Sequence, residues 1–281
     1  MFKDGLLKGR RALISGGGTG LGKAMGHRFM ELGADLVICG RREKLLDETA
    51  GEFADEFGRA VEVHRCDIRD ADAVDAMVEA AFQSAPVDIL VNNAAGNILA
   101  RYETLSPRAI DAVLGIVLHG AAYLTLSCGK RWIEAGQAAN VLSIVTTYAW
   151  TGSAYVVPSA MGKAGALALT RSLAAEWGQY GIRLNAIAPG PFPTKGAWDR
   201  LLPTEAYAKE FETRMPMGRP GEIPELADLA AFLVSDGAGY ITGEVVTIDG
   251  GEWLGNAGQF NIMKSMSAAD WDAFRERQKG G

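Results

Sequence analysis

Cysteine is scarce in this sequence, with three residues among 281. So small and odd a number excludes a disulfide framework, and the apolar surroundings of all three predict buried thiols in a reducing compartment. Histidine also occurs only three times, and no spacing of cysteine and histidine matches a metal site, so no metal is expected. The Gly-x-Ser-x-Gly motif of many serine hydrolases is missing too.

Positive charge is not in excess, since 28 Lys and Arg residues face 34 Asp and Glu residues, for a net charge of −6. Phosphate backbones repel a mildly acidic chain, so nucleic acid is not an expected partner. A local basic pocket for a phosphorylated small molecule remains compatible with this charge.

Long apolar runs are lacking as well. The longest uncharged stretch, residues 112–129, contains a histidine and three glycines, which favours a buried or interface helix over a membrane span. Its His119 is expected in the core. The first residues contain no apolar signal region, so we expect a cytoplasmic protein.

Short runs rich in Val, Ile and Leu alternate with helical patterns along the whole chain. The predicted strands are 11–15, 35–40, 60–66, 87–92, 140–144, 183–188 and 244–248, and the predicted helices are 20–32, 43–57, 71–84, 108–135, 158–180 and 224–235. This alternation predicts an α/β protein with a doubly wound Rossmann fold, in which a parallel seven-stranded sheet forms a single domain over residues 1–281.

Two segments interrupt the alternation. A proline-rich insertion at about 189–220 predicts a substrate loop. The polar tail at about 254–281 contains an amphipathic piece, 268–277, that is expected to pack on a neighbouring subunit or on the domain edge.

The first predicted strand runs into Gly-Gly-Gly-Thr-Gly-Leu-Gly at 16–22 and then into a helix. Glycines let the backbone approach a pyrophosphate at a helix N-terminus, although this spacing differs from G-x-G-x-x-G and a plain flexible turn is the alternative. Many dinucleotide sites have an acid at the end of the second strand, but here Arg41 and Arg42 stand there. Arginine suits a 2′-phosphate, so the motif favours NADPH over NADH. Alternatively, both arginines are solvated charges at a helix start.

These motifs resemble the short-chain dehydrogenase/reductase family over nearly the whole chain. Its other marks follow in order: Cys-Asp-Ile at 66–68, Asn-Asn-Ala-Ala-Gly at 92–96, Pro-Gly-Pro at 189–191 and Asp-Gly-Gly at 249–251. The resemblance implies that Asp67 contacts adenine and that the segment from Pro189 to Thr194 closes over the nicotinamide. The implied cofactor-binding residues are Gly16, Gly18, Thr19, Gly20, Leu21, Arg41, Asp67, Asn93, Lys163, Pro189, Gly190, Pro191, Phe192 and Thr194.

The catalytic motif departs from the usual Tyr-x-x-x-Lys of that family. Lys163 is present, but Ser159 stands four residues earlier, and Thr146 occupies the position of the usual serine. A serine hydroxyl has too high a pKa to replace tyrosine as a proton donor. Two tyrosines remain nearby, Tyr155 in a predicted loop and Tyr148 directly after the fifth strand, at the edge of the sheet where such folds bind ligands.

Segments 147–165, 16–23, 92–97, 189–197 and 258–261 resemble one subgroup, the mitochondrial-type 2,4-dienoyl-CoA reductases. The resemblance implies that Tyr148 and Asn97 hydrogen-bond the thioester carbonyl of a 2,4-dienoyl-CoA. It further implies that Lys163 holds the nicotinamide ribose and that Ser159 supports the network. The implied reaction is NADPH-dependent reduction to trans-3-enoyl-CoA in β-oxidation of unsaturated fatty acids.

The same resemblance implies a homotetramer, with the 108–135 helix as a contact, and CoA-binding residues Arg69, Ile98, Ser106 and Arg200. Several alternatives stay open at this point. Both arginines can be plain surface residues, and Ser106 before a proline is also a good helix N-cap. Asn97 can be a loop cap, and Tyr148 can be a packing residue. The protein can also be another NADPH-dependent enoyl-CoA or carbonyl reductase, or a non-catalytic NADP-binding protein.

Overall fold

The computed structural model describes residues 2–194 and 215–279. In this part of the chain, one sheet contains seven parallel strands in the order β3-β2-β1-β4-β5-β6-β7. The strands are β1 (Arg11–Ser15), β2 (Asp35–Gly40), β3 (Glu62–Arg65), β4 (Ile89–Asn92), β5 (Ala139–Ile144), β6 (Ile182–Pro189) and β7 (Val245–Ile248). The predicted doubly wound fold in a single domain is confirmed, and strand order reverses between β1 and β4.

The strands form here because their apolar residues are buried on both faces of the sheet, as their Val, Ile and Leu content predicted. Every residue of β1, β4 and β5 is buried. The sheet is covered by α1 (Gly20–Glu31), α2 (Glu43–Phe57), α3 (Ala71–Ser84), α5 (Gly120–Ala135), α7 (Val157–Trp177) and α10 (Ile223–Val234). The other α-helices of the described residues are α4 (Pro107–Leu114), α6 (Tyr148–Thr151), α11 (Glu252–Ala257) and α12 (Ala268–Lys279).

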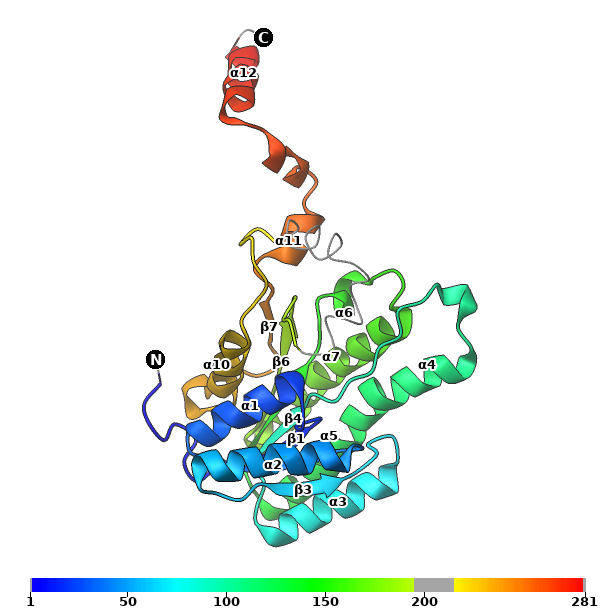
Figure 1. Cartoon of the computed structure of the whole chain (residues 1–281), viewed down its shortest axis with the longest axis vertical. Coiled ribbons are helices and arrows are strands. Elements are labelled where there is room, and N and C mark those ends of the chain that lie inside the picture. The colour runs from blue at the N-terminus through cyan, green and yellow to red at the C-terminus, as the bar shows by residue number, and fades with distance from the viewer. Residues whose placement is uncertain (1, 195–214, 280–281) are drawn as a thin grey trace.

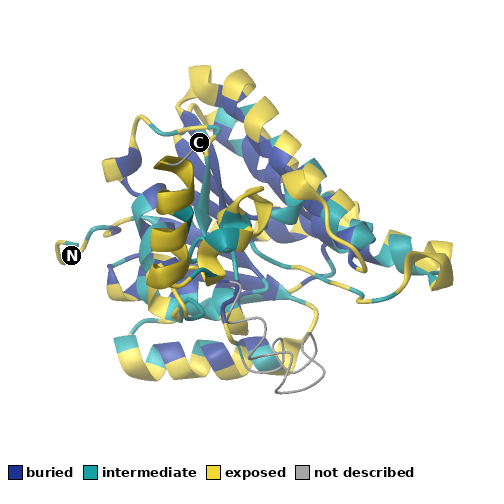
Figure 2. Cartoon of the chain, turned by 90° about the horizontal axis from the view of Figure 1, so that it is seen from above, coloured by how far each residue is buried: buried dark blue, intermediate teal, exposed yellow. Residues whose placement is uncertain are grey.

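The two larger hydrophobic clusters of the described residues lie on opposite faces of the sheet. One joins the strands to α1, α2 and α10, with Phe29 and Leu226 among its buried side chains. The other joins them to α3, α5 and α7, with Val78 and Trp132. Figure 2 shows the result, in which buried residues line the sheet and the inner sides of the helices while exposed residues face outward.

The long predicted helix at 108–135 is not a single α-helix. Between α4 and α5 the turn Gly115–His119 is π-helical, a distortion common at functional sites. Val117 packs beside Gly162 of α7 on the inner side, which leaves His119 exposed. The expectation of a core His119 was therefore wrong.

By length and mean hydropathy of 1.7, the run Pro107–Ala135 can cross a membrane. In the fold, however, the apolar side of α5 packs on α3 and on the sheet. Leu124, Cys128 and Trp132 of α5 are fully buried in the cluster with α3 and the sheet, which is the packing of a core helix.

The C-terminal tail stands away from the rest of the molecule. Figure 1 shows α12 beyond α11, apart from the sheet and the helices that cover it. The expected packing on the domain edge is therefore wrong, and packing on a neighbouring subunit stays a prediction. Of the insertion at 189–220, residues 189–194 and 215–220 belong to the described part of the chain.

Candidate active site

The glycine-rich turn leaves β1 at the point where strand order reverses. Gly16 has a φ of +69°, a conformation that side chains disfavour. A Cβ on Gly22 would lie 2.4 Å from the carbonyl oxygen of Gly16 and 2.5 Å from Asn93 Nδ2. Asn93 Nδ2 donates to the carbonyl oxygens of Ser15, at 3.0 Å, and Gly16, at 3.3 Å, so Asn93 holds the turn against the end of β4.

A cavity of about 200 Å³ opens beside this turn, at the carboxyl ends of β1 to β4. Its walls combine backbone of the glycine turn, basic side chains and branched apolar side chains. The lining residues are Gly16, Gly18, Thr19, Gly40, Arg41, Arg42, Leu45, Leu46, Cys66, Asp67, Ile68, Asn93, Ala94, Ala95 and Ile116. This combination fits the adenosine half of a dinucleotide, with apolar walls for a base, arginines for a phosphate on the ribose, and a glycine turn for the pyrophosphate.

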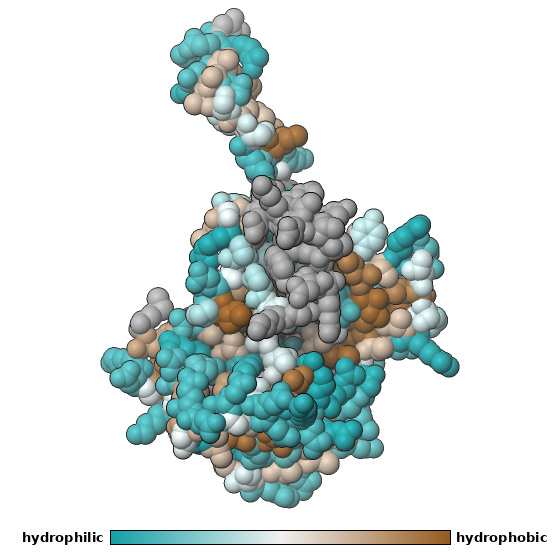
Figure 3. All heavy atoms as spheres, in the orientation of Figure 1, coloured by the Kyte–Doolittle hydropathy of each residue, from teal (hydrophilic) through white to brown (hydrophobic). Residues whose placement is uncertain are grey.

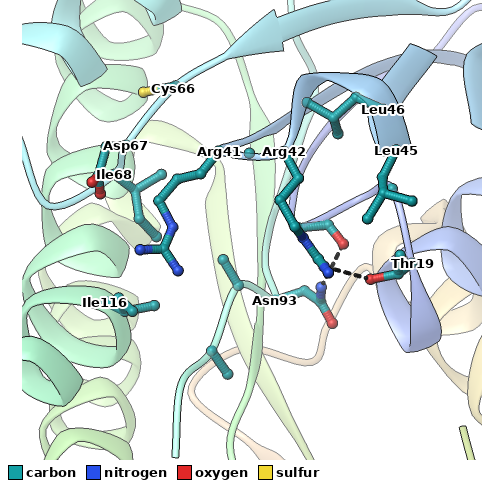
Figure 4. A pocket seen from close by; sticks show the side chains of 15 residues that line it. Thr19, Arg41, Arg42, Leu45, Leu46, Cys66, Asp67, Ile68, Asn93 and Ile116 are labelled. Carbon is teal, nitrogen blue, oxygen red and sulfur yellow. Dashed lines mark hydrogen bonds between the residues drawn. The ribbon is translucent and has the colours of Figure 1, made fainter. Parts of the chain in front are cut away.

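Figure 4 shows Arg41 and Arg42 extending from the end of β2 into this cavity, with Asp67 beyond Arg41 and Thr19 beside Arg42. Arg42 Nη2 donates to Thr19 Oγ1 over 3.2 Å. Both arginines are exposed, so they reach the cavity from solvent rather than from the core. Arg41 and the glycine-rich turn, both predicted to bind the cofactor, therefore line the same cavity.

Asp67 is already engaged by another predicted residue. Arg69 Nε donates to both carboxylate oxygens of Asp67, at 2.9 and 3.0 Å. The hydrogen bonds from Arg69 hold the pKa of Asp67 below its usual range. Arg69 is therefore paired with a residue of the cavity wall, and it must release or share Asp67 to meet a CoA phosphate.

Tyr148 and Ser159 are brought together across two helices. Tyr148 begins α6, three residues beyond Val145, and its Oη lies 3.0 Å from Ser159 Oγ on α7. Ser159 is buried. Burial raises the pKa of the Tyr148 phenol, and the hydrogen bond with Ser159 opposes this shift. The phenol is thus protonated near neutral pH and available as a hydrogen-bond donor.

Lys163 lies one turn further along α7 and is 7% exposed. Its Nζ donates to the carbonyl oxygen of Ile144, the last residue of β5. Burial lowers the pKa of Lys163 to about 8. The ammonium group has three protons to donate, and its hydrogen bond to Ile144 leaves it further donors for a ligand.

The segment after β6 is held close to the end of β7. A Cβ on Gly190 would lie 2.6 Å from the Cβ of Asp249, and Gly190 N donates to Ile248 O over 2.9 Å. Pro191 and Phe192 are buried. At the end of this segment, side-chain atoms of Thr194 lie 3.8 Å from the position that a Cβ on Gly20 would take, where α1 begins and Leu21 follows. The residues predicted around the nicotinamide therefore lie at the same edge of the sheet.

The residues predicted to hold the thioester and CoA are less closely gathered. Asn97 is exposed, and its side chain makes no hydrogen bond within the described part of the chain. Ile98 is half-buried. Ser106 accepts a hydrogen bond from Ala109 N over 3.2 Å, so it caps α4, as the alternative interpretation held. Arg200 lies outside the described residues.

Some residues of the site were not among those predicted. Ile68 and Ile116 wall the cavity, and Arg42 joins Arg41 in it. Arg42 was visible in the sequence beside Arg41. Ile116 lies in the π-helical turn, for which the sequence contains no signal, and the one-turn helix α6 is likewise too short to leave a periodic pattern.

The comparisons with known proteins agree with this geometry. Residues 16–252 match a family model described as enoyl-(acyl carrier protein) reductase. Probable 2,4-dienoyl-CoA reductase 3 of Caenorhabditis elegans, named as (3E)-enoyl-CoA-producing, is 44% identical over 264 residues, which cover 92% of this chain and 85% of the relative. A probable 2,4-dienoyl-CoA reductase of Bacillus subtilis (strain 168), named as (2E)-enoyl-CoA-producing, is 42% identical over 247 residues, 87% of this chain and 97% of the relative.

Solved structures share the fold. A short chain dehydrogenase from Bacillus anthracis is 40% identical, with a TM-score of 0.81 that covers 89% of this chain and 98% of the other. A gluconate 5-dehydrogenase from Burkholderia cenocepacia, in complex with NADP and tartrate, is 31% identical with a TM-score of 0.83, covering 89% of this chain and 98% of the other. The chain belongs to the short-chain dehydrogenase/reductase family of oxidoreductases.

Proposed function

We propose that the protein is an NADPH-dependent 2,4-dienoyl-CoA reductase that acts in the β-oxidation of unsaturated fatty acids. The observation that carries this proposal is the 3.0 Å contact between Tyr148 Oη and Ser159 Oγ. The phenol of Tyr148 on α6 thus lies beside residue 159 of α7, the position at which the usual family motif has its tyrosine. Relatives named as 2,4-dienoyl-CoA reductases support the same substrate class.

The chemistry explains why a displaced tyrosine suits this reaction. NADPH, when bound, supplies a hydride to C5 of the dienoyl chain. The electrons of the conjugated system move toward the thioester, and negative charge develops on its oxygen. Tyr148 donates to that oxygen, as an oxyanion-hole donor does, and Asn97 is the second proposed donor. Lys163 holds the nicotinamide ribose, and Ser159 orients the phenol of Tyr148.

Protonation of the dienolate decides the product. A proton added at C2 leaves a 3-enoyl thioester, whereas a proton added at C4 leaves a 2-enoyl thioester. We propose the trans-3-enoyl product, with a proton delivered through water ordered by Tyr148. The two relatives named above differ in this respect, so the product is a separate question from the substrate.

The acyl-CoA needs a surface for its chain. The side that carries α4, α6 and α7 shows a concentration of apolar residues in Figure 3. Exposed apolar side chains belong to this side as well: Leu99 after β4 and Met161 on α7. We propose that part of this surface receives the acyl chain and that part serves contacts of a cytoplasmic homotetramer.

The direct experiment is to follow NADPH oxidation with a 2,4-dienoyl-CoA and to identify the double bond of the product by NMR. The comparison substrates are a 2-enoyl-CoA with NADPH, and gluconate with NADP⁺. Gluconate is included because solved relatives include a gluconate 5-dehydrogenase, and its oxidation is followed as reduction of NADP⁺. Turnover of the dienoyl thioester at least tenfold above the others supports the proposal. Preferred turnover of the 2-enoyl-CoA or of gluconate would contradict it.

Arg41→Ala should weaken NADPH binding about 10- to 100-fold and leave NADH binding nearly unchanged. The reason is that a charge-assisted hydrogen bond to a phosphate typically contributes about 1.5–3 kcal/mol, and NADH lacks that phosphate. Fluorescence titration of both cofactors measures the change. Arg65→Ala is the matched control, because Arg65 is an exposed arginine at the end of β3 and does not line the cavity. Equal losses for both cofactors would rule out the 2′-phosphate role.

A further inference from the structure

The helix that carries Tyr148 is too short to be stable by itself. It spans four residues, Tyr148–Thr151, whereas isolated helices need about 12–15 residues to be even marginally stable in water. Its orientation therefore depends on contacts with the rest of the fold. Two of these lie on its inner side: the Tyr148–Ser159 hydrogen bond, and Ala149, which packs on a small cluster around Val145 and Leu167.

A third contact holds α6 from its outer side. The rings of Trp150 and Trp253 meet edge to face, with centroids 6.0 Å apart and planes at 84°. Trp253 belongs to α11, a hundred residues later in the sequence, and Figure 1 shows α11 and α6 near one another above the carboxyl edge of the sheet. Edge-to-face pairs at this separation are favourable beyond the area they bury.

Trp253 is itself held in place from below. The buried carboxylate of Asp249, directly after β7, accepts hydrogen bonds from Gly251 N at 2.8 Å and Trp253 N at 2.9 Å. Asp249 in turn packs against Gly190, as the 2.6 Å approach there shows. A continuous path of contacts therefore runs from the end of the sheet through Asp249 and Trp253 to the outer side of α6.

We infer that Trp253 is a positioning residue for the reaction: by packing on Trp150 it fixes α6 and so aims the phenol of Tyr148. This inference rests on the proposed role of Tyr148 and adds to it a residue from the C-terminal segment. Trp253 acts through Tyr148, so its removal affects the rate of the chemical step rather than substrate or cofactor binding.

Trp253→Ala is expected to lower kcat for the dienoyl thioester about 3- to 10-fold, the range that the energy of one aromatic pair allows. The KM and the Kd for NADPH should stay within a factor of two. Trp253→Phe should restore most of the rate, because phenylalanine keeps an aromatic edge for Trp150. Trp150→Ala should reproduce the loss, and the double variant should be no slower than either single one. Near-UV circular dichroism should lose the same signal in both single variants.

The decisive comparison is made in a Tyr148→Phe background. If Trp253 acts through the phenol, then Trp253→Ala lowers kcat there by less than twofold. Full additivity of the two losses, or a rise in KM without a change in kcat, overturns the inference, since either means that Trp253 acts independently of Tyr148 or contacts the substrate. Trp271→Ala is the control, because this tryptophan of α12 pairs with Phe274 of the same helix and should leave the rate unchanged.

The two hypotheses fail in different ways. A normal rate for Tyr148→Phe alone contradicts the proposed function of that residue, whatever Trp253 does. A slow Tyr148→Phe enzyme together with an unaffected Trp253→Ala enzyme contradicts only the role of Trp253. If Trp253→Ala loses the circular dichroism signal but keeps its rate, the role of Trp253 is also contradicted. The contact between the two tryptophans is then broken while the reaction is unaffected.

Discussion

Replacing Tyr148 by phenylalanine is expected to lower kcat about 10²–10³-fold, while the KM for a dienoyl thioester changes little. The loss of one oxyanion donor typically has this effect on rate, equivalent to about 3–4 kcal/mol of transition-state stabilisation. It falls on kcat because the hydrogen bond strengthens as charge develops on the thioester oxygen. Steady-state kinetics with saturating NADPH measures it.

Tyr155→Phe is the matched control. Tyr155 is the one non-glycine residue of the described chain with positive φ, at +65°, and it is 58% exposed. Its backbone oxygen accepts a hydrogen bond from Ala100 N over 2.9 Å, but its phenol has no hydrogen-bond partner among the described residues. Removing that hydroxyl should leave kcat within about twofold. An inactive Tyr155→Phe enzyme beside a near-normal Tyr148→Phe enzyme would refute the assignment of the site.

Ser159→Ala is expected to fall between these two. Ser159 contributes no charge stabilisation of its own, but it is the hydrogen-bond partner of the Tyr148 phenol. Without the Ser159 hydroxyl, the Tyr148 phenol can still donate a hydrogen bond, but its orientation is no longer fixed. The order of rates Tyr155→Phe, Ser159→Ala, Tyr148→Phe, from fastest to slowest, therefore tests the arrangement as a whole.

The sheet was predictable because its strands are buried on both faces. Runs such as Leu13–Ile14 at 11–15 or Leu90–Val91 at 87–92 are almost continuously apolar, and short runs of this kind between helical segments are typical of buried parallel strands. Strand ends differ by one or two residues, as β3 shows, because a strand ends where its pairing with the neighbouring strand ends, and the apolar pattern does not mark that point: Cys66 is buried but lies outside β3. The π-helical turn was not predictable, because it depends on how Val117 packs beside Gly162.

The site was predictable where one residue type performs one task. Glycines at a strand-to-helix turn and arginines at the end of β2 predicted a shared site, and the structure brings both to the wall of one cavity. Where a side chain has two possible roles, the sequence did not show which of them it has. Arg69 pairs with Asp67 and Ser106 caps α4, and only their neighbours in space decide between these contacts and a CoA phosphate. Tyr148 is an intermediate case. The sequence indicated a tyrosine hydroxyl near the site, but only the structure shows that its hydrogen-bond partner is Ser159.

Lys163→Met is the second change with a large expected effect, and it acts on stability and on function in opposite directions. The Lys163 ammonium is buried, and burial lowers its pKa from 10.5 to about 8. A shift of this size corresponds to a destabilisation of the folded state of about 3 kcal/mol at neutral pH. Methionine has a similar length and no charge, so the variant without cofactor should be more stable than the wild type at pH 7.

The lowered pKa of Lys163 predicts how the stability of the wild type changes with pH. Between about pH 8 and 10.5 the unfolded lysine holds its proton while the folded one has lost it, so the unfolded state binds more protons and the stability of the wild type gains from rising pH. Above that range the destabilisation is gone. The stability advantage of Lys163→Met should therefore be largest below pH 8 and vanish by about pH 10.5, as measured by denaturant unfolding at a series of pH values. Lys130→Met, at an exposed position of α5, should show no such trend.

Cofactor binding should reverse the order of stability. Hydrogen bonds from a charged group contribute about 1.5–3 kcal/mol each, so loss of the lysine donors to the nicotinamide ribose should lower kcat/KM about 10²-fold and weaken NADPH binding. A ligand stabilises the folded state in proportion to the logarithm of its concentration over its Kd, and saturating NADPH should therefore raise the melting temperature of the wild type more than that of Lys163→Met. A variant that is less stable than the wild type at pH 7, with an equal response to NADPH, would show that the ammonium serves the fold rather than the cofactor. If the variant is more stable than the wild type at pH 7 and responds less to NADPH, then Lys163 serves cofactor binding and lowers the stability of the folded protein.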